Sequence, residues 1–154
     1  MALFVSTVVN KIDRKGRVSV PAPFRNALAG QSFIGIVALP SFKFPALQCA
    51  GMDWMEQLSA RIDALDLYSE AHDDFTASLF ADAHSLSFDG DGRVLLPDRL
   101  VSHAQLTAAA AFVGRGPTFE IWHPAAFERY RDEARQRMLE QGMTLGRAAK
   151  SGSV

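Results

Sequence analysis

Four basic side chains lie within seven residues near the start of the chain, at Lys11, Arg14, Lys15 and Arg17. Cations this close together can neutralise neighbouring phosphates of a nucleic acid, and each neutralised phosphate releases counterions. An arginine on a rigid turn can also pair with a guanine through two hydrogen bonds, for about 1–3 kcal/mol of discrimination. Arg17 and Arg14 are the best candidates for such base contacts. The alternative is that Arg17 only forms an ion pair with Asp13, four residues earlier.

The charge of the chain is divided unevenly along its length. The formal net charge is −1, but residues 1–30 carry five basic residues against Asp13 alone and so hold a charge of +4. Residues 53–74 are the reverse, with seven acidic residues against the single Arg61. Salt screens each charged patch beyond about 10 Å at moderate ionic strength. One end of the chain can therefore attract a polyanion while the whole stays near neutral.

The stretch that holds these cations occurs twice. Residues 13–21 read DRKGRVSVP and residues 89–97 read DGDGRVLLP, so an aspartate, a glycine, an arginine and a proline recur at a constant offset of 76. The second copy keeps its arginine, Arg93, but has Gly90 and Asp91 in place of two cations. We therefore interpret it mainly as a structural partner, in which Arg93 bonds within the fold or to a neighbouring subunit. The candidate nucleic-acid contacts are Lys11, Arg14, Lys15, Arg17 and Arg93.

Each copy has the pattern of a turn between two short strands, followed by a helix. Alternating apolar residues over 3–9 predict a strand that ends near Lys11, and a second strand begins at Arg17, so the segment between them is expected to be a β-hairpin. Pro21 cannot donate to a strand ladder and suits the first turn of a helix. That helix is expected to end at Gly30, a residue typical of helix C-termini.

Further elements complete the first half. Two more strands are expected within residues 32–40 and 42–44. Asp53 and Glu56 have the spacing of a capping box, which predicts that a helix begins there. The segment 70–81 is also predicted to be helical. Its expected inward-facing side chains are Phe75, Leu79 and Phe80.

The second half is expected to contain four strands and a closing helix. The strands read SLSFD, RVLLP, AAFVG and TFEIW. The helix begins at Pro124, and its apolar face is expected to hold Phe127, Tyr130, Ala134 and Met138. The chain therefore divides into a first unit at residues 1–76, a second unit at 77–141, and a tail at 142–154 that lacks a sustained apolar pattern and is expected to be flexible.

The sequence lacks the residues that several classes of function require. Cys49 is the only cysteine and cannot form an internal disulfide, which fits a reducing compartment such as the cytoplasm. No apolar run approaches the ~20 residues that cross a bilayer, and no catalytic or nucleotide-binding motif occurs. His72, Asp73 and Asp74 group together, but no other histidine lies at a metal-site spacing from them. We expect no enzyme activity, cofactor, metal, membrane segment or small-molecule substrate.

The duplicated motif resembles that of the MraZ family of bacterial transcriptional regulators. The likeness covers nearly the whole chain. It rests on DRKGRVSVPAPFR at residues 13–25, DGDGRVLLPDRL at 89–100 and FEIWHPAAFERY at 119–130. Two copies at this separation, each followed by strands and a helix, are far more specific than one copy alone.

The resemblance implies an α+β fold of the AbrB-like swapped-hairpin superfamily, in which two tandem units interlock into one small β-barrel flanked by helices. It also implies that several subunits form a closed ring. The ring would bind short direct repeats in double-stranded promoter DNA and regulate the operon for cell division and cell-wall synthesis, including the regulator's own gene. Such a protein is cytoplasmic and nucleoid-associated. The alternative is an oligomeric scaffold or antitoxin-like protein-binding module, whose basic cluster faces a protein partner.

Overall fold

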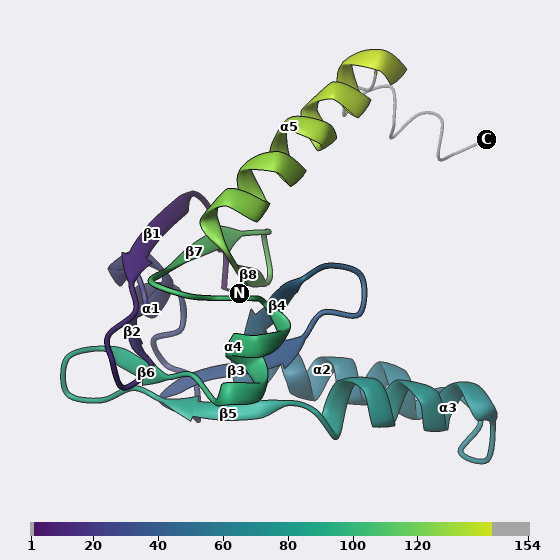
Figure 1. Ribbon diagram of the computed structural model, residues 1–154. Coiled ribbons are helices and arrows are strands. Elements are labelled where there is room, and N and C mark those ends of the chain that lie inside the picture. The colour runs from purple at the N-terminus through teal and green to yellow at the C-terminus, as the bar shows by residue number, and fades with distance from the viewer. Residues whose placement is uncertain (1, 143–154) are drawn as a thin grey trace. The chain divides into compact units, whose positions relative to one another are not determined.

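The computed structural model describes residues 2–142, which form an α+β fold (Figure 1). The strands are β1 (Thr7–Lys11), β2 (Arg17–Ser19), β3 (Gly35–Pro40), β4 (Ala46–Ala50), β5 (His84–Ser87), β6 (Arg93–Leu95), β7 (Ala109–Gly114) and β8 (Phe119–Trp122). The helices are α1 (Ala22–Ala27), α2 (Met52–Asp63), α3 (Glu70–Phe75), the π-helical η1 (Thr76–Phe80), α4 (Asp98–His103) and α5 (Pro124–Gln141). The chain divides after Pro124 into two compact units, and the first unit holds all these elements except α5.

The two halves of the chain share one antiparallel sheet, because the first strand of each half pairs with the other half. The order of this six-stranded sheet is β1-β7-β8-β4-β3-β5. In the β1–β7 pair Thr7 lies opposite Val113, and in the β5–β3 pair Ser87 lies opposite Gly35. The hairpins β3–β4 and β7–β8 stay within their own halves and meet through β4 and β8 at the centre of the sheet.

The six strands do not close into a barrel, so the expected barrel is wrong. β1 and β5 stay at the two edges of the sheet, and β2 and β6 pair with each other in a separate ribbon. The expected ladder between the first two strands is also absent, apart from a single bridge between Ile12 and Val18. The ribbon is only three residue pairs long. Pro21 and Pro97, which cannot donate to a ladder, follow soon after its strands and keep it short.

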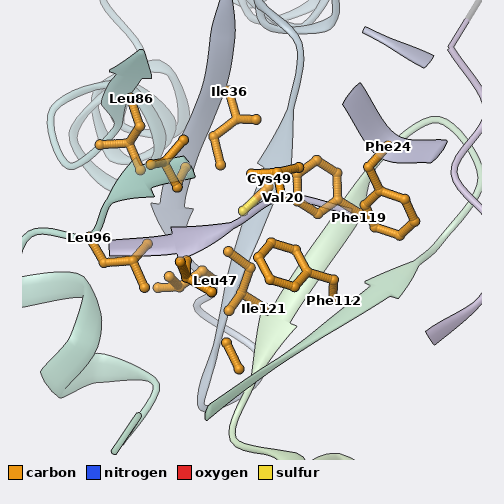
Figure 2. Close-up of a cluster of buried hydrophobic side chains, with 14 of the residues drawn as sticks. Val20, Phe24, Ile36, Leu47, Cys49, Leu86, Leu96, Phe112, Phe119 and Ile121 are labelled. Carbon is orange, nitrogen blue, oxygen red and sulfur yellow. The ribbon is translucent and has the colours of Figure 1, made fainter. Parts of the chain in front are cut away.

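Both halves of the sheet pack against one hydrophobic core, part of which is drawn in Figure 2. Aromatic rings lie at its centre. The ring centroid of Phe24, from α1, lies 5.4 Å from Phe4, 5.0 Å from Phe119 and 6.3 Å from Phe112. These rings meet edge to face, an arrangement that stabilises beyond the apolar area buried. The short helix that follows each motif therefore delivers a core residue, Phe24 from α1 and Leu100 from α4.

The strand expected over residues 3–9 is interrupted at Ser6. Ser6 has a φ of +79°, and β1 begins only after it, at Thr7. The break lets the backbone of Phe4 run against Gly114, where an added Cβ would lie 2.5 Å from the Phe4 carbonyl carbon. Phe4 is thereby almost fully buried, whereas Leu3 is exposed. The alternation in the sequence did not reveal this change of direction.

Residues 42–44 form a turn, and the prediction of a strand there is wrong. The hydroxyl of Ser41 accepts two backbone amides of this segment, at 3.2 and 3.1 Å. A serine side chain that bonds the backbone in this way favours a turn over a ladder. The second strand of this hairpin is β4, which begins at Ala46.

The capping box predicted for α2 is not formed. The helix begins at Met52 with Gly51 as its N-cap, and no side chain of the N-cap residue caps it. The backbone amide of Asp53 is instead bonded at 3.0 Å by the side-chain oxygen of Gln31. A residue 22 positions earlier thus supplies the acceptor that the sequence pattern assigned to Asp53 and Glu56.

The strand β3 is buried on both faces, which explains its continuous apolar run. Ile36 faces the core, whereas Val37 faces a second cluster that includes Ile62 of α2 and Leu79 of η1. The segment predicted as one helix is helical, but α3 passes into a π-helical turn after Phe75. A π-turn shifts which residues share a face. Phe75, which was expected to face inward, is accordingly 42% exposed.

The last helix, α5, begins at Pro124 as expected. Met138, predicted for its apolar face, is 52% exposed. The whole segment from Arg135 to Gln141 is exposed as well. The predicted flexible tail lies outside the described residues, apart from Gly142. Within residues 2–142, no helix combines the length and the apolar character needed to span a membrane.

Candidate nucleic-acid interface

The two copies of the motif form the same turn, with the same backbone hydrogen bonds. The amide of Asp13 donates to the Arg17 carbonyl at 2.9 Å, and the amide of Gly16 donates back to Asp13 at 3.0 Å. The corresponding bonds in the second copy measure 2.9 and 3.1 Å. The turn glycine of each copy has a positive φ, +89° at Gly16 and +74° at Gly92. Because other residues are strained there, glycine is needed in both copies.

The aspartate of each turn organises the residues that follow it. Asp13 Oδ1 accepts the backbone amides of Lys15 and Arg17, both at 2.9 Å, and Oδ2 accepts Arg17 Nε at 2.6 Å. These bonds favour the carboxylate form, so the pKa of Asp13 is lowered, chiefly by the amide of Arg17. The pKa of Asp89 is lowered in the same way, chiefly by the amide of Arg93. The ion pair considered for Arg17 is therefore present.

This ion pair leaves the end of the Arg17 side chain available. Asp13 engages only Nε, and no other side chain or carbonyl among residues 2–142 bonds the guanidinium. The side chain of Arg17 is 35% exposed. The two terminal nitrogens are the donors that a bidentate contact with guanine or phosphate uses. Ion pairing and ligand binding by Arg17 are thus compatible.

Arg93 has a different environment, although its turn has the same shape. Its Nε donates to Asp89 Oδ2 at 2.9 Å, as in the first copy. In addition, Nη2 lies 3.3 Å from Asp91 Oδ2 and Nη1 lies 4.0 Å from Asp13 Oδ2. Three carboxylates therefore surround this guanidinium. The end of the side chain that Arg17 leaves available is engaged within the fold in Arg93.

The other predicted residues lie close to Arg17 along the chain. Lys11 is the last residue of β1, and Arg14 and Lys15 lie on the turn itself. All three side chains are exposed, and none forms an ion pair with a residue of the described part of the chain. The four cations of the first copy thus lie on the segment 11–17, a hairpin whose two arms are joined by the single Ile12–Val18 bridge.

The two turns lie next to each other through the β2–β6 ribbon. Val18 pairs with Val94, and two further bonds cross between the copies. The Val20 amide donates to the Gly92 carbonyl at 3.1 Å, and the Leu96 amide donates to the Gly16 carbonyl at 2.9 Å. A cationic turn and an acidic turn are therefore fixed side by side.

Two residues at this site were not singled out from the sequence. Asn10 donates from its side-chain amide to the Ser19 carbonyl at 2.7 Å and so ties β1 to β2. Arg25 of α1 donates from Nη1 to the Val20 carbonyl and lies against Gly92 of the second turn. The sequence shows only the charge of Arg25, because Gly92, against which it lies, is brought near by the fold.

The residues that could suggest a metal site are not gathered into one. His72 Nδ1 lies 3.9 Å from Asp73 Oδ1 and has no hydrogen-bond partner. Within residues 2–142 no group of three or more histidine, cysteine, aspartate or glutamate side chains is placed to hold a metal ion.

Comparison with known proteins relates the chain to a bacterial family. Residues 79–144, which include the second copy of the motif, match the family model described as "MraZ protein, putative antitoxin-like". The Transcriptional regulator MraZ of Rickettsia akari is 44% identical over 148 residues, covering 96% of this chain and 99% of the relative. The protein of the same description from Gluconacetobacter diazotrophicus is 46% identical over 140 residues, covering 89% of each chain.

These relatives place the chain among transcriptional regulators rather than enzymes. More narrowly, it belongs to the MraZ family. The resemblance identified from the duplicated motif is therefore confirmed over almost the full chain.

Proposed function

We propose that the protein is a sequence-specific DNA-binding regulator that contacts promoter DNA with the hairpin at residues 11–17. The observation that carries this proposal is the difference between two arginines in equivalent turns. Arg17 has both terminal nitrogens available, whereas those of Arg93 face Asp91 and Asp13. A site that reads base edges needs donors that are oriented but unoccupied.

The four cations of the first hairpin have complementary roles in this proposal. Lys11, Arg14 and Lys15 are exposed and neutralise backbone phosphates, which supplies affinity and position. Arg17, held through Nε by Asp13, contacts a guanine in the major groove. Arg93 mainly bonds within the fold and so stabilises the site, and it contributes less to DNA binding than the other four residues.

Repetition in the assembly and in the DNA supplies the remaining specificity. Two or three base contacts per subunit discriminate weakly, at about 1–3 kcal/mol for each good pair. A closed ring of subunits that binds several short direct repeats gains through effective concentration. We propose that these repeats lie upstream of the operon for cell division and cell-wall synthesis, which the protein regulates together with its own gene. The protein then acts on the nucleoid in the cytoplasm, with residues 1–76 and 77–141 as its two tandem swapped-hairpin units.

A binding titration tests the proposal. The probe is a duplex from the region upstream of the protein's own coding sequence, with a shuffled duplex of the same composition as reference. Wild-type affinity should fall steeply with salt, and the Arg17→Ala, Lys15→Ala double variant should lose binding while remaining folded. The matched control is Arg61→Ala with Lys43→Ala, which removes one exposed arginine and one exposed lysine elsewhere. An equal loss of affinity in both double variants, or an affinity that does not change with salt, would rule out this interface.

The description of the matching family model favours one second candidate. An antitoxin-like module or scaffold would direct the same basic hairpin at a protein. In that case the wild type binds neither duplex, and light scattering still reports the assembly.

A further inference from the structure

Arg25 joins the helix of the first copy to the turn of the second. Its Nη1 donates to the carbonyl of Val20, just after β2. Its guanidinium also lies over Gly92, where an added Cβ would be 2.8 Å from both Cζ and Nε. The absence of a side chain at Gly92 is therefore what allows Arg25 to lie there. Arg25 is half-buried in this position.

Val20 and Gly92 are also bonded directly to each other. The Val20 amide donates to the Gly92 carbonyl at 3.1 Å, while the Val20 carbonyl accepts from Arg25. Three contacts thus close a loop between helix, ribbon and turn. We call this set of three residues, Arg25, Val20 and Gly92, the Arg25 clamp.

The clamp exists on one side of the pseudosymmetric pair only. The residue that lies 76 positions after Arg25 is Val101, which has no side-chain donor. The turn glycine of the first copy, Gly16, has no arginine of the other copy packed against it in the described part of the chain. An added Cβ at Gly16 would meet Leu96 O at 3.5 Å and Leu95 Cδ1 at 3.6 Å, both ordinary contact distances. A backbone bond thus crosses to each turn, but among residues 2–142 only the acidic turn is also contacted by an arginine side chain from the helix of the other copy.

We propose that Arg25 is a positioning residue for DNA recognition, which sets the acidic turn beside the cationic one without touching DNA itself. Arg17 begins the same three-residue strand that ends one residue before Val20. Through Gly92 the clamp also places the neighbouring Arg93 within 4.0 Å of Asp13, the residue that orients Arg17. This role rests on the proposed DNA-binding function, but the clamp can be measured without DNA.

The DNA experiment compares Arg25→Gln with Arg61→Gln, which removes the same charge from an exposed site on α2. The readouts are the affinity ratio between the upstream and shuffled duplexes and the slope of log affinity against log salt. For Arg25→Gln we expect the ratio to fall roughly tenfold, the effect of about one charge-assisted hydrogen bond, with an unchanged slope. A slope shallower by about 1 would mean that Arg25 contacts a phosphate and would overturn the proposal. An unchanged ratio would overturn it as well.

The DNA-independent experiment measures hydrogen exchange in the peptides that contain the second turn. Arg25→Gln should speed exchange of the residue 89–96 amides, with no change at α2, whereas Arg61→Gln should leave both unchanged. A double-mutant cycle adds Gly92→Ala, which displaces Arg25, and uses Gly16→Ala as the control with similar backbone strain. Coupling of Arg25 to Gly92 but not to Gly16 is expected; no coupling to Gly92 would refute the clamp. If wild-type protein binds neither duplex while this coupling is present, the proposed function fails and the clamp stands.

Discussion

Asp13 holds Arg17 by its backbone and by its side chain at once. One carboxylate oxygen accepts the Arg17 amide at 2.9 Å, and the other accepts Nε at 2.6 Å. Two attachment points fix both the start of β2 and the direction of the guanidinium. The carboxylate therefore orients the arginine while leaving its terminal donors available.

Replacing Asp13 by asparagine tests whether its carboxylate orients Arg17, when the result is compared with the same change of charge elsewhere. Asparagine Oδ1 still accepts the backbone amides, but its Nδ2 cannot accept from Arg17 Nε. We expect the affinity ratio between upstream and shuffled duplexes to fall roughly tenfold, although removing a negative charge raises binding to both. Asp63→Asn makes the same charge change on α2 and should leave the ratio unchanged. If the ratio in Asp13→Asn equals that of the control, the carboxylate does not orient Arg17.

The two turn aspartates make stability depend on acid pH. The pKa values of Asp13 and Asp89 are lowered in the folded protein by hydrogen bonds to their carboxylates. The unfolded chain therefore binds more protons in this range, so the free energy of unfolding rises with pH. The contribution is complete above the unfolded aspartate pKa of about 4 and is lost as pH falls through the lower folded values. Urea unfolding at a series of acid pH values should show a smaller slope in Asp13→Asn, Asp89→Asn than in the wild type; equal slopes would contradict the assignment.

Cys49 should be unreactive in the folded protein. The thiol is fully buried in β4, and burial, followed by the nearby charge of Glu120, raises its pKa well above the ordinary value. Only the thiolate is an effective nucleophile. A thiol reagent at pH 8 should modify the native protein at the rate of unfolding, and one thiol per chain should react at once in urea. Rapid modification of the native protein would show that the sheet opens at β4.

Phe24 should be the most costly residue of α1 to truncate. Its ring packs against three other phenylalanines within 6.3 Å. Phe24→Ala is expected to lower the free energy of unfolding by about 3–5 kcal/mol. Phe42, which is 69% exposed, supplies the matched control, since Phe42→Ala should change it by only about 0.5 kcal/mol. Denaturant unfolding measures both, and similar losses would place Phe24 outside the core.

Local chemistry was predictable from the sequence. The turn of each motif depends on an aspartate, a glycine and a proline within nine residues, and its hydrogen bonds are short-range. The same holds for the helix after Pro21, which needs only a missing donor and an apolar residue to bury. The four cations could be grouped as one candidate site for the same reason, because they lie within seven residues of the sequence.

Long-range pairing could not be predicted in the same way. The alternation of residues 3–9 predicts a strand but does not specify its partner, and the break at Ser6 depends on the approach of Gly114. The cap of α2 comes from Gln31, and Gly92, against which Arg25 lies, comes from the other half of the chain. In each case the deciding contact lies at least 22 residues away. A short sequence window contains no information on such a neighbour.

The exchange of first strands between the halves has a consequence during protein synthesis. β1 and the cationic hairpin leave the ribosome early, but the partner of β1 is β7, and Thr7 lies opposite Val113. β1 therefore stays unpaired until most of the polypeptide has been made, at about 5–20 residues per second. A nascent chain carries the cations before β1 and β2 have their partner strands β7 and β6. The surface proposed to bind DNA is therefore complete only after most of the chain has been made.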